Sequence, residues 1–179
     1  MKKVIILWIG GILFCSCDIL LPRPISDNDD DDQEYYESTS TVLSDLTKDE
    51  AEAVTFLTDF YILYINWFMG GTPSSGYEEC LSKDLLKAFE YFDEYFDETG
   101  YQVLDCDPFI KAQDVASSLR EWNFVIKKTD ETNCYEMCYD DICVKLYVIK
   151  QNGKYLIEDV ENETAGTVCR LMNNMLYSY

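Results

Sequence analysis

The sequence contains no histidine, and it has only 14 lysines and arginines against 34 aspartates and glutamates in 179 residues. Without histidine, a serine or cysteine nucleophile lacks its usual general base, and a metal site lacks its commonest ligand. The formal net charge of −20 repels nucleic acid, because such binding depends on basic residues that contact phosphates. The composition therefore argues against nucleic-acid binding, and it leaves carboxylates as the available catalytic groups.

The N-terminus lacks an apolar run long enough to span a hydrocarbon layer about 30 Å thick. Residues 4–14 are apolar, follow Lys2 and Lys3, and end at Phe-Cys-Ser-Cys, which is typical of a signal peptide that closes in a lipobox. We expect residues 1–16 to be removed and Cys17 to carry the lipid. Several acyl chains on one cysteine anchor a protein stably to a membrane. An ordinary secretory signal or an uncleaved anchor is the alternative.

Residues 17–46 have little to bury, since they contain two prolines, an acidic run over 27–34 and a cluster of serine and threonine. This composition predicts a disordered acidic tether behind the lipidated cysteine. A calcium loop counted from Asp27 fails, because the sixth position is Asp32 instead of glycine and the twelfth is Ser38 instead of glutamate. We expect neither a metal nor a cofactor.

The chain contains 8 cysteines, of which Cys15 and Cys17 belong to the signal and the anchor. An even number of remaining cysteines in an exported chain is typical of disulfides, although many pairings are possible. A zinc site is disfavoured because C-x-x-C pairs and histidine are both missing. The candidate disulfide cysteines are Cys80, Cys106, Cys134, Cys138, Cys143 and Cys169.

Residues 47–179 predict one globular domain that begins with helices. The Thr47-x-x-Glu50 capping box starts a helix whose apolar and aromatic residues recur at helical spacing as far as Gly70. Ser82 caps a second helix that stops near Gly100, and its acids are expected to form a solvated face. Residues 101–105 predict a short strand, and the following Asp-Pro pair predicts a helical turn.

The last third predicts an antiparallel meander. A two-residue turn at Asp140-Asp141 sets a register that separates apolar from polar faces and places Cys138 opposite Cys143, as a cross-strand disulfide requires. A second hairpin turns at Asn152-Gly153, with Val148 opposite Ile157, and residues 123–128 add another strand.

The remaining cysteine pairs follow less directly. Cys134 is expected beside Tyr147 on the outer face, where the tail could bring Cys169 to bond it, and Cys80 with Cys106 is left by elimination. Helices first and antiparallel strands after them indicate an α+β fold, in which N-terminal helices pack on one side of a curved antiparallel sheet.

Residues 104–109, Leu-Asp-Cys-Asp-Pro-Phe, and residues 112–114, Ala-Gln-Asp, resemble an uncharacterised bacterial lipoprotein family, domain of unknown function 3828. An aromatic first helix and a closing hairpin extend the resemblance to about residues 50–160. It implies a cystatin-like cone of the nuclear-transport-factor type, and it brings no established activity. The candidate pocket or motif residues are Asp105, Asp107, Pro108, Phe109, Gln113 and Asp114.

Three functions are compatible with these observations. We expect a lipid-anchored protein of the bacterial cell envelope, at the outer membrane, that acts as a binding or interaction module for a protein or small molecule. An immunity-like or inhibitor protein against a cationic enzyme is the first alternative. A carboxylate-dependent enzyme that uses Asp105, Asp107 or Asp114 is the second, and a structural role for these three residues is its competing interpretation.

Overall fold

The computed structural model describes residues 46–70 and 76–177. All of them belong to one compact unit, Ser40–Tyr179. The predicted signal peptide, the lipidation of Cys17 and nearly all of the predicted tether lie outside the described residues. Within the described ranges, no helix combines the length and the apolar character needed to cross a membrane.

Helix α2, Lys48–Phe68, starts with the predicted capping box. The Glu50 amide donates to the Thr47 hydroxyl at 3.3 Å, and the Thr47 amide donates to the Glu50 carboxylate at 2.8 Å. These bonds satisfy two amides that have no partner inside the helix. The buried face of α2 consists of Ala53, Leu57, Phe60, Tyr61, Tyr64 and Ile65.

Helix α3, Lys83–Thr99, also agrees with the prediction. The Ser82 hydroxyl accepts from the Leu85 amide at 3.1 Å, and Gly100 ends the helix with a φ of 70°, which favours glycine. A short 3-10 helix, η1, Glu78–Cys80, precedes α3. The buried residues of α3 are Leu85, Ala88 and Phe92.

The segment after α3 differs from the prediction. Residues 101–105 form no strand, so that prediction is wrong. A turn does begin at Asp107, but it closes as an isolated bridge to Ala112, with the Asp107 amide donating to the Ala112 carbonyl at 3.1 Å. The chain therefore folds back on itself instead of continuing as a helix. Helix α4, Ser117–Arg120, follows.

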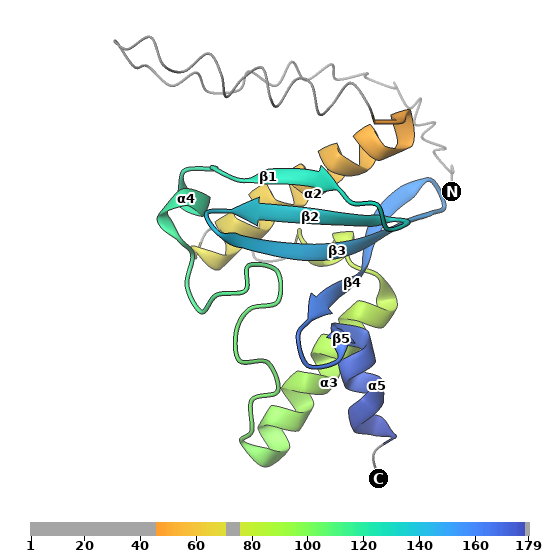
Figure 1. Cartoon of the computed structure of the whole chain (residues 1–179). Coiled ribbons are helices and arrows are strands. Elements are labelled where there is room, and N and C mark those ends of the chain that lie inside the picture. Colours follow the sequence, from red (N-terminus) through yellow and green to blue (C-terminus); the bar gives the residue numbers. More distant parts are fainter. Residues whose placement is uncertain (1–45, 71–75, 178–179) are drawn as a thin grey trace, which may run out of the picture. The chain divides into compact units, whose positions relative to one another are not determined.

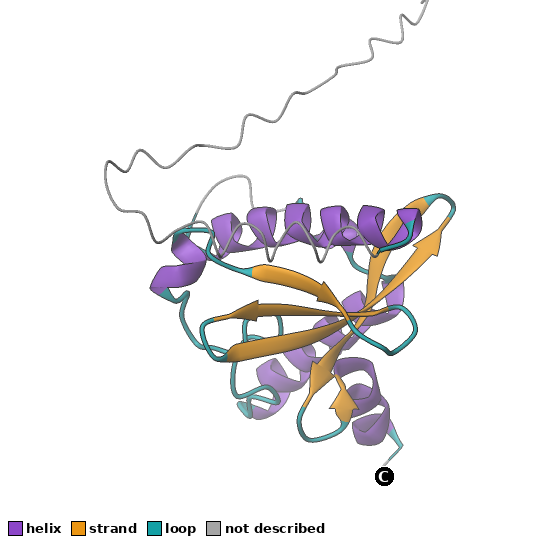
Figure 2. Ribbon diagram, turned by 45° about the horizontal axis from the view of Figure 1, so that its top comes forward, coloured by secondary structure: helices purple, strands orange, loops and turns teal. Residues whose placement is uncertain are grey.

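Five antiparallel strands form one sheet in the order β1-β2-β3-β4-β5. The described fold is thus α+β, with N-terminal helices packed against this sheet. Helix α2 lies along the sheet (Figure 2). Helices α3 and α5 lie together beside the β4–β5 end of the sheet (Figure 1). The strands are β1, Val125–Lys128; β2, Cys134–Tyr139; β3, Ile142–Gln151; β4, Lys154–Asn162; and β5, Gly166–Thr167.

The predicted register of both hairpins is confirmed. Tyr139 faces Ile142 and Cys138 faces Cys143 across the first hairpin, and Val148 faces Ile157 across the second. One side of the first hairpin is buried against the helices, as the alternation requires. Those buried residues are Tyr135, Met137, Tyr139, Val144 and Leu146.

Helix α5, Val168–Leu176, was not expected from the sequence. The Thr167 hydroxyl accepts from the Arg170 amide at 3.4 Å, and Val168 is fully buried. The helix packs against α3 and β4. It therefore closes the β4–β5 end of the core, and it carries Cys169 over the sheet as the sequence suggested.

The predicted disulfide between Cys138 and Cys143 is present, with Cα atoms 4.2 Å apart. The other two predicted disulfides are absent, since Cys80, Cys106, Cys134 and Cys169 are free thiols. Cys134 does pair with Tyr147 on β3, but Tyr147 in turn pairs with Asp159 on β4.

The Asp159 carboxylate accepts from the Cys169 amide at 3.0 Å, so a whole strand separates Cys169 from Cys134. Cys80 and Cys106 also have different surroundings. Asp59 and Glu79 lie near Cys80, whereas Lys111 and Glu163 lie near Cys106. Neither predicted pair is therefore bonded.

The disulfide leads to a first prediction. Replacing Cys143 with serine should lower the free energy of unfolding by about 2 kcal/mol, because the bond closes only a short loop in the unfolded chain. Urea denaturation of the oxidised protein measures this. The matched change Cys80→Ser should leave the stabilising effect of oxidation intact. If reductant destabilised Cys143→Ser as much as the parent chain, a second disulfide would have to exist.

Candidate functional site

A pocket of about 660 Å³ lies between α3 and the segment that leads to α4. In Figure 1 this segment starts at the lower end of α3 and runs back up beside the helix toward the sheet. The pocket contains four of the six residues predicted from the 104–114 motif. The lining residues are Phe68, Phe89, Phe92, Asp93, Phe96, Gln102, Val103, Leu104, Asp105, Cys106, Asp107, Pro108, Ala112 and Gln113.

Asp107 forms the floor of this region, and both of its carboxylate oxygens have partners. The Tyr64 hydroxyl donates to Oδ2. The amides of Phe109 and Ile110 donate to Oδ1 at 2.9 and 3.1 Å. Burial raises the pKa of Asp107 above its usual 3.8, although these three hydrogen bonds oppose the shift. The carboxylate therefore holds the turn together, as the structural interpretation of the motif predicted.

Phe109 lies in the core and not in the pocket, with 2 % of its surface exposed. Its ring centroid is 5.1 Å from that of Phe60, 4.9 Å from that of Tyr64 and 5.8 Å from that of Phe89. Aromatic pairs at such distances are attractive beyond the area that they bury. The phenylalanine of the motif is thus an anchor that fastens the turn to α2 and α3.

Two buried tyrosines fix the backbone of the same turn. The Tyr61 hydroxyl donates to the Phe109 carbonyl at 2.8 Å, and the Tyr139 hydroxyl donates to the Ile110 carbonyl at 2.5 Å. Burial is the main cause that raises the pKa of both tyrosines, so both stay protonated donors. Groups from α2 and β2 therefore hold the pocket floor rigidly in place.

The walls of the pocket combine phenylalanine rings with carboxylates. Phe68, Phe89 and Phe92 are partly or fully buried, whereas Phe96 is 49 % exposed at the rim. Asp93 and Asp105 are exposed, and within the described part of the chain neither carboxylate has a hydrogen-bond or ion-pair partner. The described lining includes no lysine or arginine.

The other motif residues divide between the pocket and its surroundings. Gln113 lines the pocket, and its side-chain amide donates to the Asp105 carbonyl at 3.2 Å. Pro108 lines it too. Asp114 lies outside: its Oδ1 accepts from the Val115 amide at 2.8 Å and from Arg120 at 3.3 Å. Asp114 therefore stabilises the start of the next segment.

Sequence reasoning missed the contribution of α3. Asp93 is exposed, as expected for the acids of this helix, but it also lines the pocket, together with Phe96, which was not predicted as a pocket residue. The spacing of Phe89, Phe92 and Phe96 did indicate one apolar stripe along the helix. The stripe extends beyond the core, so its last ring becomes the pocket rim.

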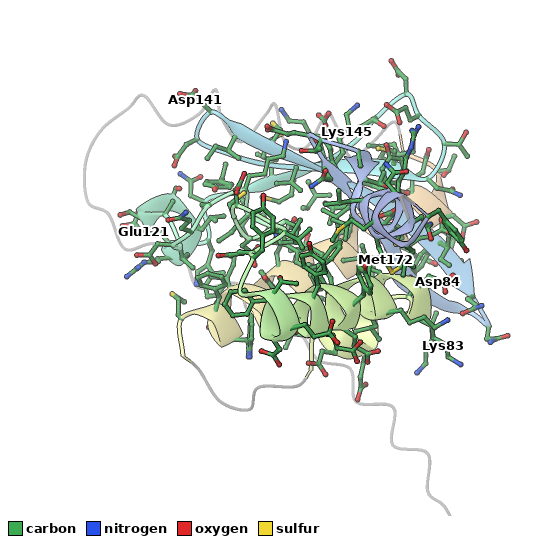
Figure 3. All side chains as sticks on the ribbon, turned by 90° about the horizontal axis from the view of Figure 1, so that it is seen from below. Lys83, Asp84, Glu121, Asp141, Lys145 and Met172 are labelled. Atoms are coloured by element: carbon green, nitrogen blue, oxygen red, sulfur yellow. A yellow bond between two sulfur atoms is a disulfide. The ribbon has the colours of Figure 1, made fainter. Side chains whose placement is uncertain are left out.

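A second cavity, of about 620 Å³, lies where α5 meets α3 and the sheet. Figure 3 shows Met172 on α5 near Asp84 at the start of α3, and both line this cavity together with Tyr147 and Cys169. Burial, with the nearby carboxylates of Asp159, Asp84 and Glu158, raises the pKa of Cys169 to about 12. A thiol held protonated in this way is a poor nucleophile.

Three potential metal ligands come together on the outer face of the sheet. Glu136, Cys138 and Cys143 bring ligand atoms within 4.8 Å of one another. The two sulfur atoms are joined in the disulfide and cannot act as thiolate ligands. This group therefore does not fit a metal ion.

Comparison with known proteins leaves the family open. No family model matches the chain. No curated protein matches it either. A solved structure of a protein of unknown function from Bacteroides thetaiotaomicron VPI-5482 is similar at 24 % sequence identity and a TM-score of 0.46, and the match covers 73 % of this chain and 98 % of that one. The resemblance to domain of unknown function 3828 therefore stays a prediction.

Proposed function

We propose that this chain is a lipid-anchored envelope protein whose globular unit binds a small molecule in the pocket between α3 and residues 102–113. The observation that carries this proposal is the pocket itself. Its volume of about 660 Å³ is in the usual range for ligand sites, and it combines apolar rings with a few polar groups. The floor is rigid because Asp107, Tyr61 and Tyr139 hold it.

The anchor part of the proposal rests on the sequence around Cys17. The apolar run, the small residue Ser16 and the following acidic tether resemble lipoprotein signals, and early acidic residues resemble export signals of some surface lipoproteins. Membership in domain of unknown function 3828 would agree with this address. We therefore place the binding unit at the outer membrane, held away from it by residues 17–46.

Binding explains the site better than catalysis does. Burial raises the pKa of the half-buried Asp107 carboxylate, yet three donors occupy its oxygens. A general base needs a lone pair that faces the substrate. The thiol Cys106 lines the pocket too, but burial raises its pKa, which makes it a weak nucleophile. The pocket therefore suits binding, because Asp107, its ionisable floor group, is occupied by hydrogen bonds that stabilise the fold.

Mass spectrometry of the chain purified gently from membranes tests both parts. In denaturing conditions, the mass should show acyl groups that Cys17→Ser removes and Cys15→Ser retains. In native conditions, an added small-molecule mass should accompany the protein. Phe96→Ala should weaken the affinity for the small molecule by roughly tenfold, because this ring forms the rim of the pocket. The bound fraction should fall accordingly.

Tyr101→Ala is the matched control, since this aromatic is 67 % exposed and does not line the pocket. It should leave the bound mass unchanged. A bare protein mass in every preparation would contradict the small-molecule proposal. The net charge of −20 would then favour the inhibitor function, whose binding to a basic protein must weaken steeply with salt.

A further inference from the structure

We propose that the pocket selects an organic cation with an apolar, ring-sized body, such as an aryl ammonium compound. This inference rests on the proposed binding function of the same pocket, and it names the chemical class of the ligand. Three properties of the site support it: carboxylates without partners, the absence of basic residues from the described lining, and several phenylalanine side chains in that lining.

The carboxylates come from two different elements that line the pocket. Asp93 projects from α3, and Asp105 belongs to the segment that faces this helix. The two side chains are exposed, and no described lysine or arginine pairs with either of them. A cation in the pocket would be attracted by both carboxylates, whereas an anion would be repelled by both.

The basic residues near the pocket are already engaged. Lys111 belongs to the same turn, but its ammonium group pairs with Glu161 at 2.8 Å. Arg120 pairs with Asp114 at 3.3 Å, outside the pocket. Since these charges are committed elsewhere, the negative potential of the pocket is left for a ligand to neutralise.

The potential also acts on a neighbouring aromatic group. Burial raises the pKa of Tyr77, and the carboxylates of Glu78, Asp107 and Asp93 raise it further. Tyr77 packs on Tyr64 and Trp67 with ring centroids 5.0 and 4.7 Å apart. Carboxylates on α3 and on the turn thus act on the same ring.

The phenylalanines add a second preference for the same ligand. Aromatic faces attract cations through their quadrupole, and they bury an apolar body at the same time. Phe96 is half exposed at the rim, while Phe68 and Phe89 are partly buried behind it. A neutral aromatic compound would gain only the burial, and a small inorganic cation would gain only the charge. An organic cation gains both.

Isothermal titration calorimetry tests this class with three matched probes. The full chain is reconstituted in nanodiscs of neutral phosphatidylcholine, and empty nanodiscs provide the blank. Benzyltrimethylammonium should bind at least tenfold more tightly than benzyl alcohol, and phenylacetate should bind weakest. Raising the salt concentration should weaken the cation more than the alcohol.

Paired variants assign the effect to the pocket. Asp93→Asn combined with Asp105→Asn should reduce the affinity for benzyltrimethylammonium by about tenfold or more and leave benzyl alcohol unchanged. The control is Glu94→Gln combined with Asp97→Asn, which removes the same charge from exposed positions of α3 outside the pocket. It should change the affinity less than twofold. Phe96→Ala should weaken both compounds.

Two results would overturn the proposed ligand class. One is equal or tighter binding of benzyl alcohol or phenylacetate. The other is an equal loss of cation affinity in the control pair, which would indicate attraction to the general charge of the protein. If benzyl alcohol still bound and Phe96→Ala still weakened it, the binding function would stand and only the cation would be wrong. Failure of all three probes to bind would contradict the ligand class, and the native mass of the purified protein would then decide whether the binding function stands.

Discussion

Replacing Phe109 with alanine is expected to lower the free energy of unfolding by about 3–5 kcal/mol. The ring is 2 % exposed and contacts Phe60, Tyr64 and Phe89, which come from both N-terminal helices. Removing it leaves a cavity that these rings cannot fill, because hydrogen bonds from Tyr61 and Tyr139 hold the surrounding backbone.

Chemical denaturation of the globular unit measures this loss, and Phe96→Ala is the matched control. The control removes the same side chain from a position that is 49 % exposed, so it should cost about 1 kcal/mol or less. Since a domain is stable by only about 5–15 kcal/mol, Phe109→Ala should approach complete unfolding at elevated temperature. A cost equal to that of the control would show that the turn does not depend on its anchor.

The two hairpins could be predicted from the sequence because their determinants are local. The turn at Asp140-Asp141 and the alternation on both sides of it define one register, and a shift by one residue would expose every apolar side chain. Asp140 and Asn152 adopt positive φ values of 45° and 53°, which these residue types tolerate best. The disulfide between Cys138 and Cys143 follows from this register alone.

The segment between α3 and β1 could not be predicted in the same way. Residues 101–116 have no period of two or of 3.6 that would select a strand or a helix. Their conformation depends on distant partners, since Tyr64 and Asp107 are 43 residues apart and Tyr61 and Phe109 are 48 apart. The sequence predicted that Asp107 caps a turn, but it did not identify the tyrosines that complete the capping.

The predictions of disulfides between distant cysteines were wrong for a related reason. Predicting that Cys169 reaches Cys134 required the path of the C-terminal segment, which folds as α5 instead of as an irregular tail. A signal for this helix was present, because Thr167 can cap it and Val168, Leu171 and Met175 share one face. Even if the helix had been predicted, the spacing of residues could not show that β3, which bears Tyr147, lies between the two thiols.

Only one wall of the pocket could be predicted from the sequence. Asp105, Asp107, Pro108 and Gln113 were identified as a group, and all four line it. The opposite wall comes from α3, where Asp93 has the sequence signature of any solvated helical acid. Only the fold brings that face against residues 102–113, so the combination of rings and unpaired carboxylates emerges from the tertiary structure.

The second large effect is expected at Asp107, where the choice of substitution matters. Asp107→Ala should cost about 3 kcal/mol or more, because it leaves the Tyr64 hydroxyl and the amides of Phe109 and Ile110 without their acceptor. Asp107→Asn should cost about 1 kcal/mol, since its Oδ1 can accept from both amides and its amide group can donate to the tyrosine oxygen. Urea denaturation at neutral pH compares the two.

The pH dependence separates the charge of Asp107 from its hydrogen bonds. Its pKa is higher in the folded chain than the usual 3.8, so the folded state binds the proton more tightly than the unfolded state. The stability that protonation supplies is fully present below the unfolded pKa, and it is lost as the pH rises through the folded pKa. The parent chain should therefore lose stability relative to Asp107→Asn over that interval, and the difference should level off on either side.

Exposed acids of the same domain contribute to stability with the opposite pH dependence. The parent chain must therefore be compared with the asparagine variant, in which these acids are unchanged. Hydrogen bonds and the charge of Lys150 lower the pKa of Asp49, so its contribution is lost as the pH falls. This contribution is common to both proteins and cancels in their difference.

If that difference instead increased in favour of the parent chain as the pH rose, the three hydrogen bonds would outweigh burial at Asp107.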